Sequence, residues 1–288
     1  MNHNPKCFHN HLGPWLLEAG WLVSAIAAIK NGWLPSAGPT QPPPGVNDSL
    51  YRTWEGVAII SIDGPMMKFN SKFGGTNTVQ TRQALRAALG DPNIGAIMLR
   101  VDSPGGSYAG TAELAQEVRN ADSLKPIFSY AEDMMASAAY WVGSQTRRIF
   151  SNATGQVGSI GTVAVLDDTS KAMEIQGVKV HVISTGEFKG AFSDGTPITP
   201  AQIQYIQSLI DSLNEHFLAG VMDGRQIDKK ALASVADGRV FIAKEAKQSG
   251  LIDQISTFED ALAYAADKKK YRPKMERAEI KRKLAENS

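Results

Sequence analysis

A serine among small residues and a lysine in a later loop are the side chains of this sequence that could perform nucleophilic chemistry. Ser137 stands in the run Ala136-Ser-Ala-Ala-Tyr-Trp141, near the expected start of a helix, where backbone N–H groups have no intrahelical partner. A serine hydroxyl placed there could attack a carbonyl carbon if a base took its proton. Viewed alone, the segment fits a helix N-cap or a packed helical serine equally well.

The base for such a serine is hard to find among the histidines. His181 falls in an expected strand, His216 lies well along an expected helix, and no G-x-S-x-G elbow is present. A lysine that is buried enough to be neutral can accept the serine proton instead. Lys189, with Phe188 and Gly190 beside it, is the candidate, although a loop lysine is usually a solvated surface charge.

Two adjacent glycines could supply electrostatic stabilisation. Gly105 and Gly106 end the segment Arg100-Val-Asp-Ser-Pro-Gly-Gly106, a buried strand that closes in a turn before a helix. Glycines let a ligand approach the backbone, and N–H donors at such a turn can stabilise a developing oxyanion. The N–H of Ala138 could join that of Gly106. A Pro-Gly-Gly turn by itself is more often only a turn.

The elements that must position these residues alternate along the chain. Hydrophobic patterning predicts strands at 57–62, 96–101, 126–130, 148–150, 162–166 and 178–183. It predicts helices at 78–89, 110–121, 136–142 and 170–176, and a long helix that begins at Thr199-Pro200. In the long helix, one face carries Ile203, Ile206, Ile210, Leu213 and Phe217, so we expect that face to pack. The alternation predicts an α/β domain with a largely parallel sheet.

Composition is that of an ordinary globular protein. The 288 residues are 43% hydrophobic and 20% charged, which predicts a packed core. Cys7 is the single cysteine, so intrachain disulfides and cysteine-based zinc sites are excluded.

Four segments together resemble the signal peptide peptidase A family in order and spacing. They are Ser103-Pro-Gly-Gly106, Ala136-Ser-Ala-Ala-Tyr140, Gly158-Ser-Ile-Gly-Thr162 and Gly186-Glu-Phe-Lys189. The resemblance covers about residues 55 to 265. It implies a fold like that of crotonases and the Clp protease, a β-β-α superhelix with a largely parallel sheet, and assembly of a homo-oligomer into a ring or dome.

The resemblance also implies roles for single residues. Ser137 would be the nucleophile and Lys189 the general base, while Ser159 would orient the lysine amine. Gly106 and Ala138 would donate to the oxyanion, with Gly105 in the same substrate-binding turn. No metal or organic cofactor is implied. In the family, the serine and the lysine can belong to one protomer or to neighbouring protomers, and the sequence leaves both arrangements open.

Composition, charge and the extent of the resemblance together divide the chain into four parts. We expect an N-terminal helical segment at 1–34, a Pro/Gly-rich linker at 35–50, a peptidase domain at 51–267 and a basic tail at 268–288. The apolar run at 21–29 is too short to span a membrane, which needs roughly 20 apolar residues. The tail fits either a solvated, frayed helix or a contact with nucleic acid, an acidic protein or a membrane surface.

Two branches of the family are compatible with these features. One contains membrane-associated peptidases that degrade signal peptides, and the other contains phage head-maturation proteases that cut capsid and scaffold proteins. The short apolar run and the start Pro14-Trp-Leu-Leu17, which is similar to the leader of phage members, favour the phage branch. Its polypeptide substrates would be met in the host cytoplasm or the procapsid; no nucleic acid partner is predicted.

Functions of other classes are also compatible with the sequence. A crotonase-like acyl-CoA enzyme would share the fold and the oxyanion turn without needing Ser137 or Lys189, although no pair of carboxylates suited to a thioester stands out. A non-catalytic scaffold protein could also retain the same motifs for its fold, without using them in catalysis.

Overall fold

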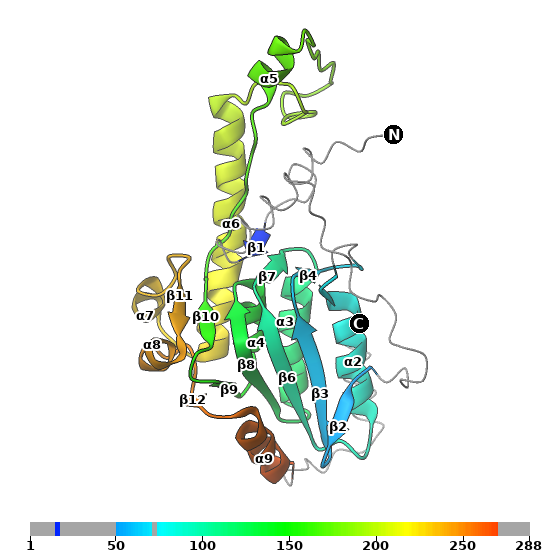
Figure 1. Ribbon diagram of the computed structural model, residues 1–288, viewed down its shortest axis with the longest axis vertical. Coiled ribbons are helices and arrows are strands. Elements are labelled where there is room, and N and C mark those ends of the chain that lie inside the picture. The colour runs from blue at the N-terminus through cyan, green and yellow to red at the C-terminus, as the bar shows by residue number, and fades with distance from the viewer. Residues whose placement is uncertain (1–14, 18–49, 71–73, 270–288) are drawn as a thin grey trace.

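A mostly parallel sheet forms the centre of the protein in the computed structural model, which describes residues 15–17, 50–70 and 74–269 (Figure 1). The strand order is β11-β10-β8-β6-β3-β2, with β9 beside β8 and β12 beside β9. The strands are β2 Arg52–Trp54, β3 Val57–Asp63, β6 Ala96–Ser103, β8 Ile127–Ala136, β9 Arg148–Ser151, β10 Gln156–Gly158, β11 Val240–Ile242 and β12 Gln254–Ile255. Within this sheet, only the β2–β3 and β10–β11 pairs are antiparallel, which confirms the α/β fold with a largely parallel sheet.

Both faces of the central strands are buried, as is usual for parallel sheets. Ile97 and Leu99 of β6 face one apolar cluster, which also contains residues of the helices on that side. Ala96 and Met98 face a second, smaller cluster under α9. Because β6 is buried on both faces, it has the continuous apolar sequence from which it was predicted.

The predicted helices are all present, and three further helices after residue 225 were not predicted. The helices are α2 Thr78–Gly90, α3 Thr111–Asp122, α4 Ala138–Gly143, α5 Ser170–Ile175, α6 Pro200–Arg225, α7 Lys229–Ala233, α8 Ala243–Gln248 and α9 Phe258–Lys268. Thr199 caps α6 in a reciprocal box with Gln202, and Pro200 holds the first helical position, as predicted. Within the described ranges, no helix combines the length and the apolar character needed to cross a bilayer.

A second, small sheet lies at the carboxyl ends of the central strands (Figure 1). Its order is β1-β7-β4-β5, with bounds Trp15–Leu17, Gly105–Ser107, Met66–Met67 and Thr76–Asn77. Residues 15–17, which belong to the segment expected to be helical, therefore form a strand. The rest of segment 1–34, the expected linker at 35–49 and the expected tail from 270 onward lie outside the described residues.

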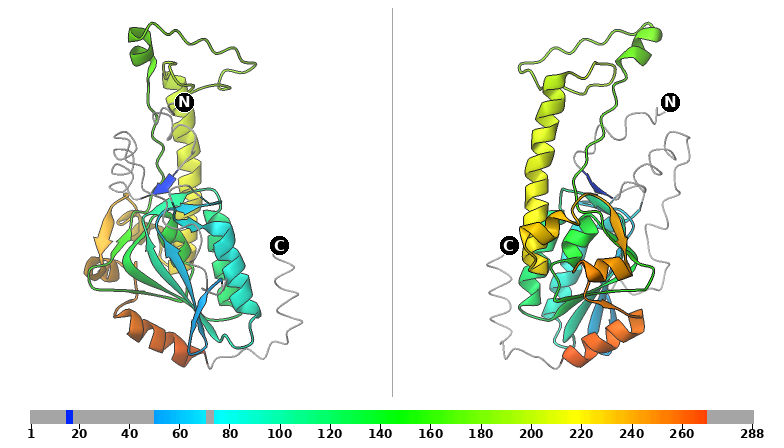
Figure 2. Two further views of the ribbon diagram at one scale, coloured as in Figure 1. Left: turned by 45° about the vertical axis from the view of Figure 1, so that its right-hand side comes forward. Right: turned by 90° about the vertical axis from the view of Figure 1, so that its left-hand side faces the viewer.

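Between β10 and the middle of α6 the chain forms an arm, residues 163–213, that projects from the body (Figures 1 and 2). The strands predicted at 162–166 and 178–183 are wrong, because neither segment forms a strand. The second segment has the apolar composition of a strand, but it lies on the arm and its Ile183 is 98% exposed. Composition alone thus suggested a strand where the fold supplies no sheet.

The apolar face predicted for α6 packs only at its carboxyl-terminal end. Phe217 and Val221 are buried, whereas Ile203 is 54% exposed because the first half of α6 belongs to the arm. Of the residues on the face that was expected to pack, only Phe217 is fully buried in the described chain.

Candidate active site

Ser137 lies between the end of β8 and the start of α4, in a strained backbone conformation. Its φ is 54° and its ψ is −118°, a combination that residues with a side chain rarely adopt. Its N–H donates to the carbonyl of Gly158 at 2.8 Å, and its own carbonyl accepts from the N–H of Trp141 at 2.9 Å. The side chain is fully buried, and Oγ has no hydrogen-bond partner among the described residues. Strain and an unpaired hydroxyl are typical of a functional position.

Ser159 occupies the matching place on the neighbouring strand. β8 and β10 pair in parallel with Ala136 opposite Gly158, so Ser137 and Ser159 each follow directly on a paired strand end. Ser159 also has a positive φ, 51°, and its N–H donates to the carbonyl of Arg239 at 2.8 Å. The structure therefore brings the two predicted serines to the same edge of the sheet.

The glycine turn lies near the same carboxyl-terminal end of the strands. It forms β7, and β7 contacts α4, the helix that follows Ser137. The N–H of Gly105 already donates to Ser103 Oγ at 3.2 Å, which leaves Gly106 as the candidate donor of this pair. A Cβ on Gly106 would lie 1.9 Å from the carbonyl oxygen of Met66, so the close approach of β4 requires glycine. Ala138 is the first residue of α4, and its N–H has no intrahelical acceptor.

Aromatic packing fixes α4 behind Ser137. Trp141 stacks on Phe217 of α6 at 5.2 Å between ring centroids, and Tyr108 meets Trp141 edge-on at 5.6 Å. A Cβ on Gly220 would lie 2.1 Å from Trp141 Nε1, so α6 can approach α4 only with glycine there. Sequence reasoning missed this contact, and the i, i+4 spacing of Gly220 and Gly224 on an apolar helix was the signal that could have found it.

A buried ion pair anchors the end of α6. Arg225, whose side chain is 7% exposed, donates to both carboxylate oxygens of Asp253 at 2.9 Å and to the carbonyl of Gly250. Burial alone would raise the pKa of Asp253, but the hydrogen bonds and charge of Arg225 lower it below its usual value. The pair keeps α6, and with it the support of Trp141, in one position.

Acidic side chains surround Arg100 next to the glycine turn. A guanidinium nitrogen of Arg100 lies 2.5 Å from a carboxylate oxygen of Glu132, and another lies 3.6 Å from a carboxylate oxygen of Asp63. Burial and the charge of Asp133 raise the pKa of Asp102. The carboxylates exceed the cations here, so this end of the sheet is acidic.

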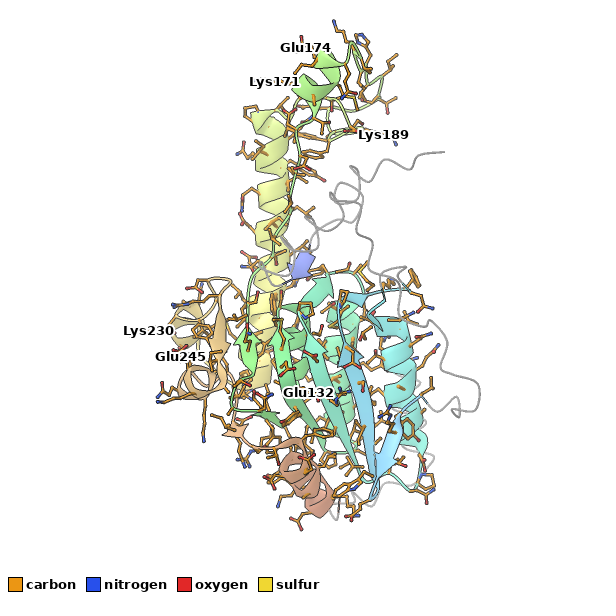
Figure 3. All side chains as sticks on the ribbon, viewed as in Figure 1. Glu132, Lys171, Glu174, Lys189, Lys230 and Glu245 are labelled. Carbon is orange, nitrogen blue, oxygen red and sulfur yellow. The ribbon has the colours of Figure 1, made fainter. Side chains whose placement is uncertain are left out.

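Lys189 is not brought to Ser137 within one chain. It lies in the loop at the end of the arm, with its side chain directed away from the body (Figure 3). Phe188 stacks on Tyr205 at 5.0 Å, and the lysine itself is exposed, so the expected desolvation by its neighbours does not occur within the chain. The physical reason is the projection of the arm. His181, also on the arm, and His216, on the outside of α6, are exposed and do not replace the lysine.

The arm carries most of the large apolar side chains that this structure leaves exposed. On it these are Ile175, Val178, Val182, Ile183, Phe188, Ile203, Tyr205 and Leu209. Exposed apolar side chains concentrated on a projecting element are typical of a protein–protein interface.

Comparisons with known proteins relate this chain to peptidases. A model of peptidase family S49 matches residues 119–272, which is more than half of the chain and includes Ser137, Ser159 and Lys189. The chain is 31% identical over 172 residues to a putative protease of Methanocaldococcus jannaschii, covering 60% of this chain and 55% of that protein. It is 27% identical over 226 residues to the capsid assembly protease C of Escherichia phage lambda, covering 75% of this chain and 50% of that protein.

A solved structure also matches the chain. An enoyl-CoA hydratase/isomerase family protein from Silicibacter pomeroyi matches with a TM-score of 0.48 and 13% identity, covering 81% of this chain and 86% of that one. The two relatives above are longer, and the chain spans about half of their length. On the family match, this chain belongs to peptidase family S49.

Proposed function

We propose that this chain is a serine endopeptidase whose catalytic pair is Ser137 of one copy and Lys189 of a neighbouring copy. The observation that carries the proposal is the state of Ser137: a buried, strained residue at a strand–helix junction, with an unpartnered Oγ among the described residues and the first residue of α4 directly after it. The strain and the unpartnered hydroxyl are costly for folding, and together these features suit a nucleophile.

The lysine is assigned to a neighbouring copy because one chain keeps it on the arm. The exposed apolar residues of the arm support its docking on another copy, where burial would favour the neutral amine that a base needs. A homo-oligomer is thus a condition of activity in this proposal. Ser159, at the strand end next to Ser137, is suited to orient the incoming amine.

The reaction in this arrangement is acyl transfer. Ser137 Oγ attacks the carbonyl carbon of a peptide bond while its proton passes to Lys189 Nζ. The N–H groups of Gly106 and Ala138 hold the oxyanion. As the C–N bond breaks, the proton moves from Lys189 to the leaving amine, and an ester remains on Ser137. Lys189 then takes a proton from water, the hydroxide attacks the ester, and the proton returns to Ser137 Oγ as the acid leaves.

We further propose that the substrates are proteins of phage capsid or scaffold maturation. The match to the lambda capsid assembly protease over 226 residues supports this branch of the family. The alternative within the family is a membrane-associated signal peptide peptidase. Full activity of the detergent-free protein on an unstructured protein substrate is expected for the first, and obligatory recovery with membranes for the second.

Subunit complementation tests the catalytic pair. Ser137→Ala and Lys189→Ala should each lose cleavage of an unstructured protein while keeping the oligomer, as measured by light scattering. When the two variants are mixed and reassembled at random, about one quarter of the sites combine an intact serine with a neighbour's intact lysine, so cleavage should return to about that fraction. Lys179→Ala, another exposed lysine of the arm, is the matched control and should stay fully active.

Each other outcome has a definite meaning. A mixture that assembles but stays inactive would show that the lysine acts within its own chain. Cleavage retained by Ser137→Ala would overturn the mechanism and favour the crotonase-like or scaffold functions.

A further inference from the structure

The outer edge of β7 is occupied by a strand from the far N-terminal part of the chain. β7 pairs with β4 on one side and with β1 on the other (Figure 1). The β1 pairing is antiparallel, with Trp15 opposite Ser107, Leu16 opposite Gly106 and Leu17 opposite Gly105. Without β1, β7 would be an open sheet edge with unpaired backbone donors and acceptors.

This edge belongs to the candidate active site. Gly106 is the proposed oxyanion donor, and α4, which begins directly after Ser137, contacts β7. An extended chain paired with β7 therefore runs past the nucleophile. Addition of a strand to an open edge is a general way in which proteins bind extended peptides, because the main chain supplies the hydrogen bonds.

We propose that residues 15–17 are an autoinhibitory strand. By pairing with the edge of β7, they prevent a substrate polypeptide from pairing there. This inference rests on the function proposed above. A segment of the same chain acts at an effective concentration of about a millimolar, so it competes with substrate without a strong sequence preference. Substrate then gains access to Gly106 and Ser137 when β1 leaves β7.

A reversible cross-link tests the inference. Opposite residues of an antiparallel pair have Cα atoms about 4.5–5.5 Å apart, within the range that a disulfide spans. We would combine Trp15→Cys with Ser107→Cys in a chain whose Cys7 is changed to Ser. The disulfide should form on oxidation and reduce peptide cleavage at least about tenfold relative to the reduced form of the same variant, and reduction should reverse the loss. Leu16→Cys with Ser107→Cys, out of register by one residue, is the matched control and should cross-link poorly.

Binding separates this inference from the proposed function. In the same cysteine variants carrying Ser137→Ala, anisotropy of a fluorescein-labelled unstructured peptide should show binding to the reduced form and at least about tenfold weaker binding to the oxidised form. Equal binding in both forms, or failure of the 15–107 disulfide to form, would overturn the autoinhibitory strand. Peptide binding that depends on reduction, without cleavage by the reduced Ser137 enzyme, would instead overturn the peptidase mechanism alone.

Two proline variants give a second test without cross-linking. Successive N–H groups of a strand point to opposite sides, so only one of Leu16→Pro and Leu17→Pro removes a donor that faces β7. One variant should therefore lower KM for peptide with kcat unchanged, and the other should resemble the parent. Identical KM values in both variants and the parent would contradict the inference.

Discussion

Ser137 and Ser159 follow directly on Ala136 and Gly158, which are paired in adjacent parallel strands, and both serines have positive φ angles of 54° and 51°. The N–H of Ser137 donates to Gly158, the residue just before Ser159, so the two strained positions are linked through the backbone. A sheet edge built in this way holds two hydroxyl-bearing residues in fixed relation before any substrate arrives.

Replacing Ser137 should separate activity from stability. Ser137→Ala keeps the strained backbone and loses only the unpartnered Oγ, so its free energy of unfolding should stay close to that of the parent. Ser137→Gly relieves strain of about 1–3 kcal/mol but adds the entropy cost of glycine, about 0.5–1 kcal/mol, and should be more stable than Ser137→Ala by about 1 kcal/mol. Thermal unfolding of both inactive variants measures the difference. A less stable Ser137→Gly would show that the φ of Ser137 is not strained.

A methyl group at Gly106 should disrupt the site. The Cβ of Gly106→Ala would lie 1.9 Å from the Met66 carbonyl oxygen, so β4 and β7 must separate and the proposed oxyanion donor must move. Loss of an oxyanion donor costs about 10²–10³ in kcat, which peptide hydrolysis would measure.

Gly90→Ala is the matched control. Gly90 ends α2, and a Cβ there meets nothing within 4 Å, so alanine should leave activity unchanged and stabilise the helix by about 0.5–1 kcal/mol. If the Gly106→Ala variant were as active as the Gly90→Ala variant, the proposed role of Gly106 would be contradicted.

The sequence was sufficient to predict elements that are marked by an uninterrupted apolar run or by a helix cap. The buried run of β6 and the capping box of α6 were read correctly, because apolar runs and caps act over a few residues. The arm was not predictable in this way. Residues 178–183 have strand composition, but whether a strand forms depends on a partner strand, which only the three-dimensional fold provides.

The site shows the same division. The resemblance marked Ser137, Ser159 and Gly106 as one site, and the structure brings their elements together. The resemblance also marked Lys189, but no pattern in the sequence predicted that the loop with this residue projects from the body (Figure 3). The distance between Ser137 and Lys189 in one chain depends on the direction of α6. That direction is set by the packing of Trp141 on Phe217.

The exposed apolar residues of the arm should be needed for assembly. Ile183 is 98% exposed, and burial of such a side chain in an interface contributes about 1.5–3 kcal/mol. Ile183→Asp should therefore raise the dissociation constant of the oligomer at least about tenfold and lower activity in parallel. Sedimentation velocity over a range of concentrations measures the shift. Ile242→Asp, at an isoleucine of the body that is 46% exposed, is the control and should assemble normally.

The Arg225–Asp253 pair should stabilise the fold in a pH-dependent way. Asp253→Asn leaves the buried Arg225 without its counter-charge, which costs about 3–5 kcal/mol at neutral pH. Since the pKa of Asp253 is lower in the folded state than the unfolded value of about 3.9, its contribution is complete above that value and is lost as the pH falls through the folded pKa. Denaturant titrations from pH 7 to pH 3 should thus show that the difference in free energy of unfolding between parent and variant shrinks in acid.

Asp237→Asn is the control. It removes the partner of an exposed pair with Arg239 and should cost less than about 1 kcal/mol at every pH. A gap for Asp253→Asn that is constant with pH would mean that loss of hydrogen-bond geometry, not loss of charge, destabilises the variant.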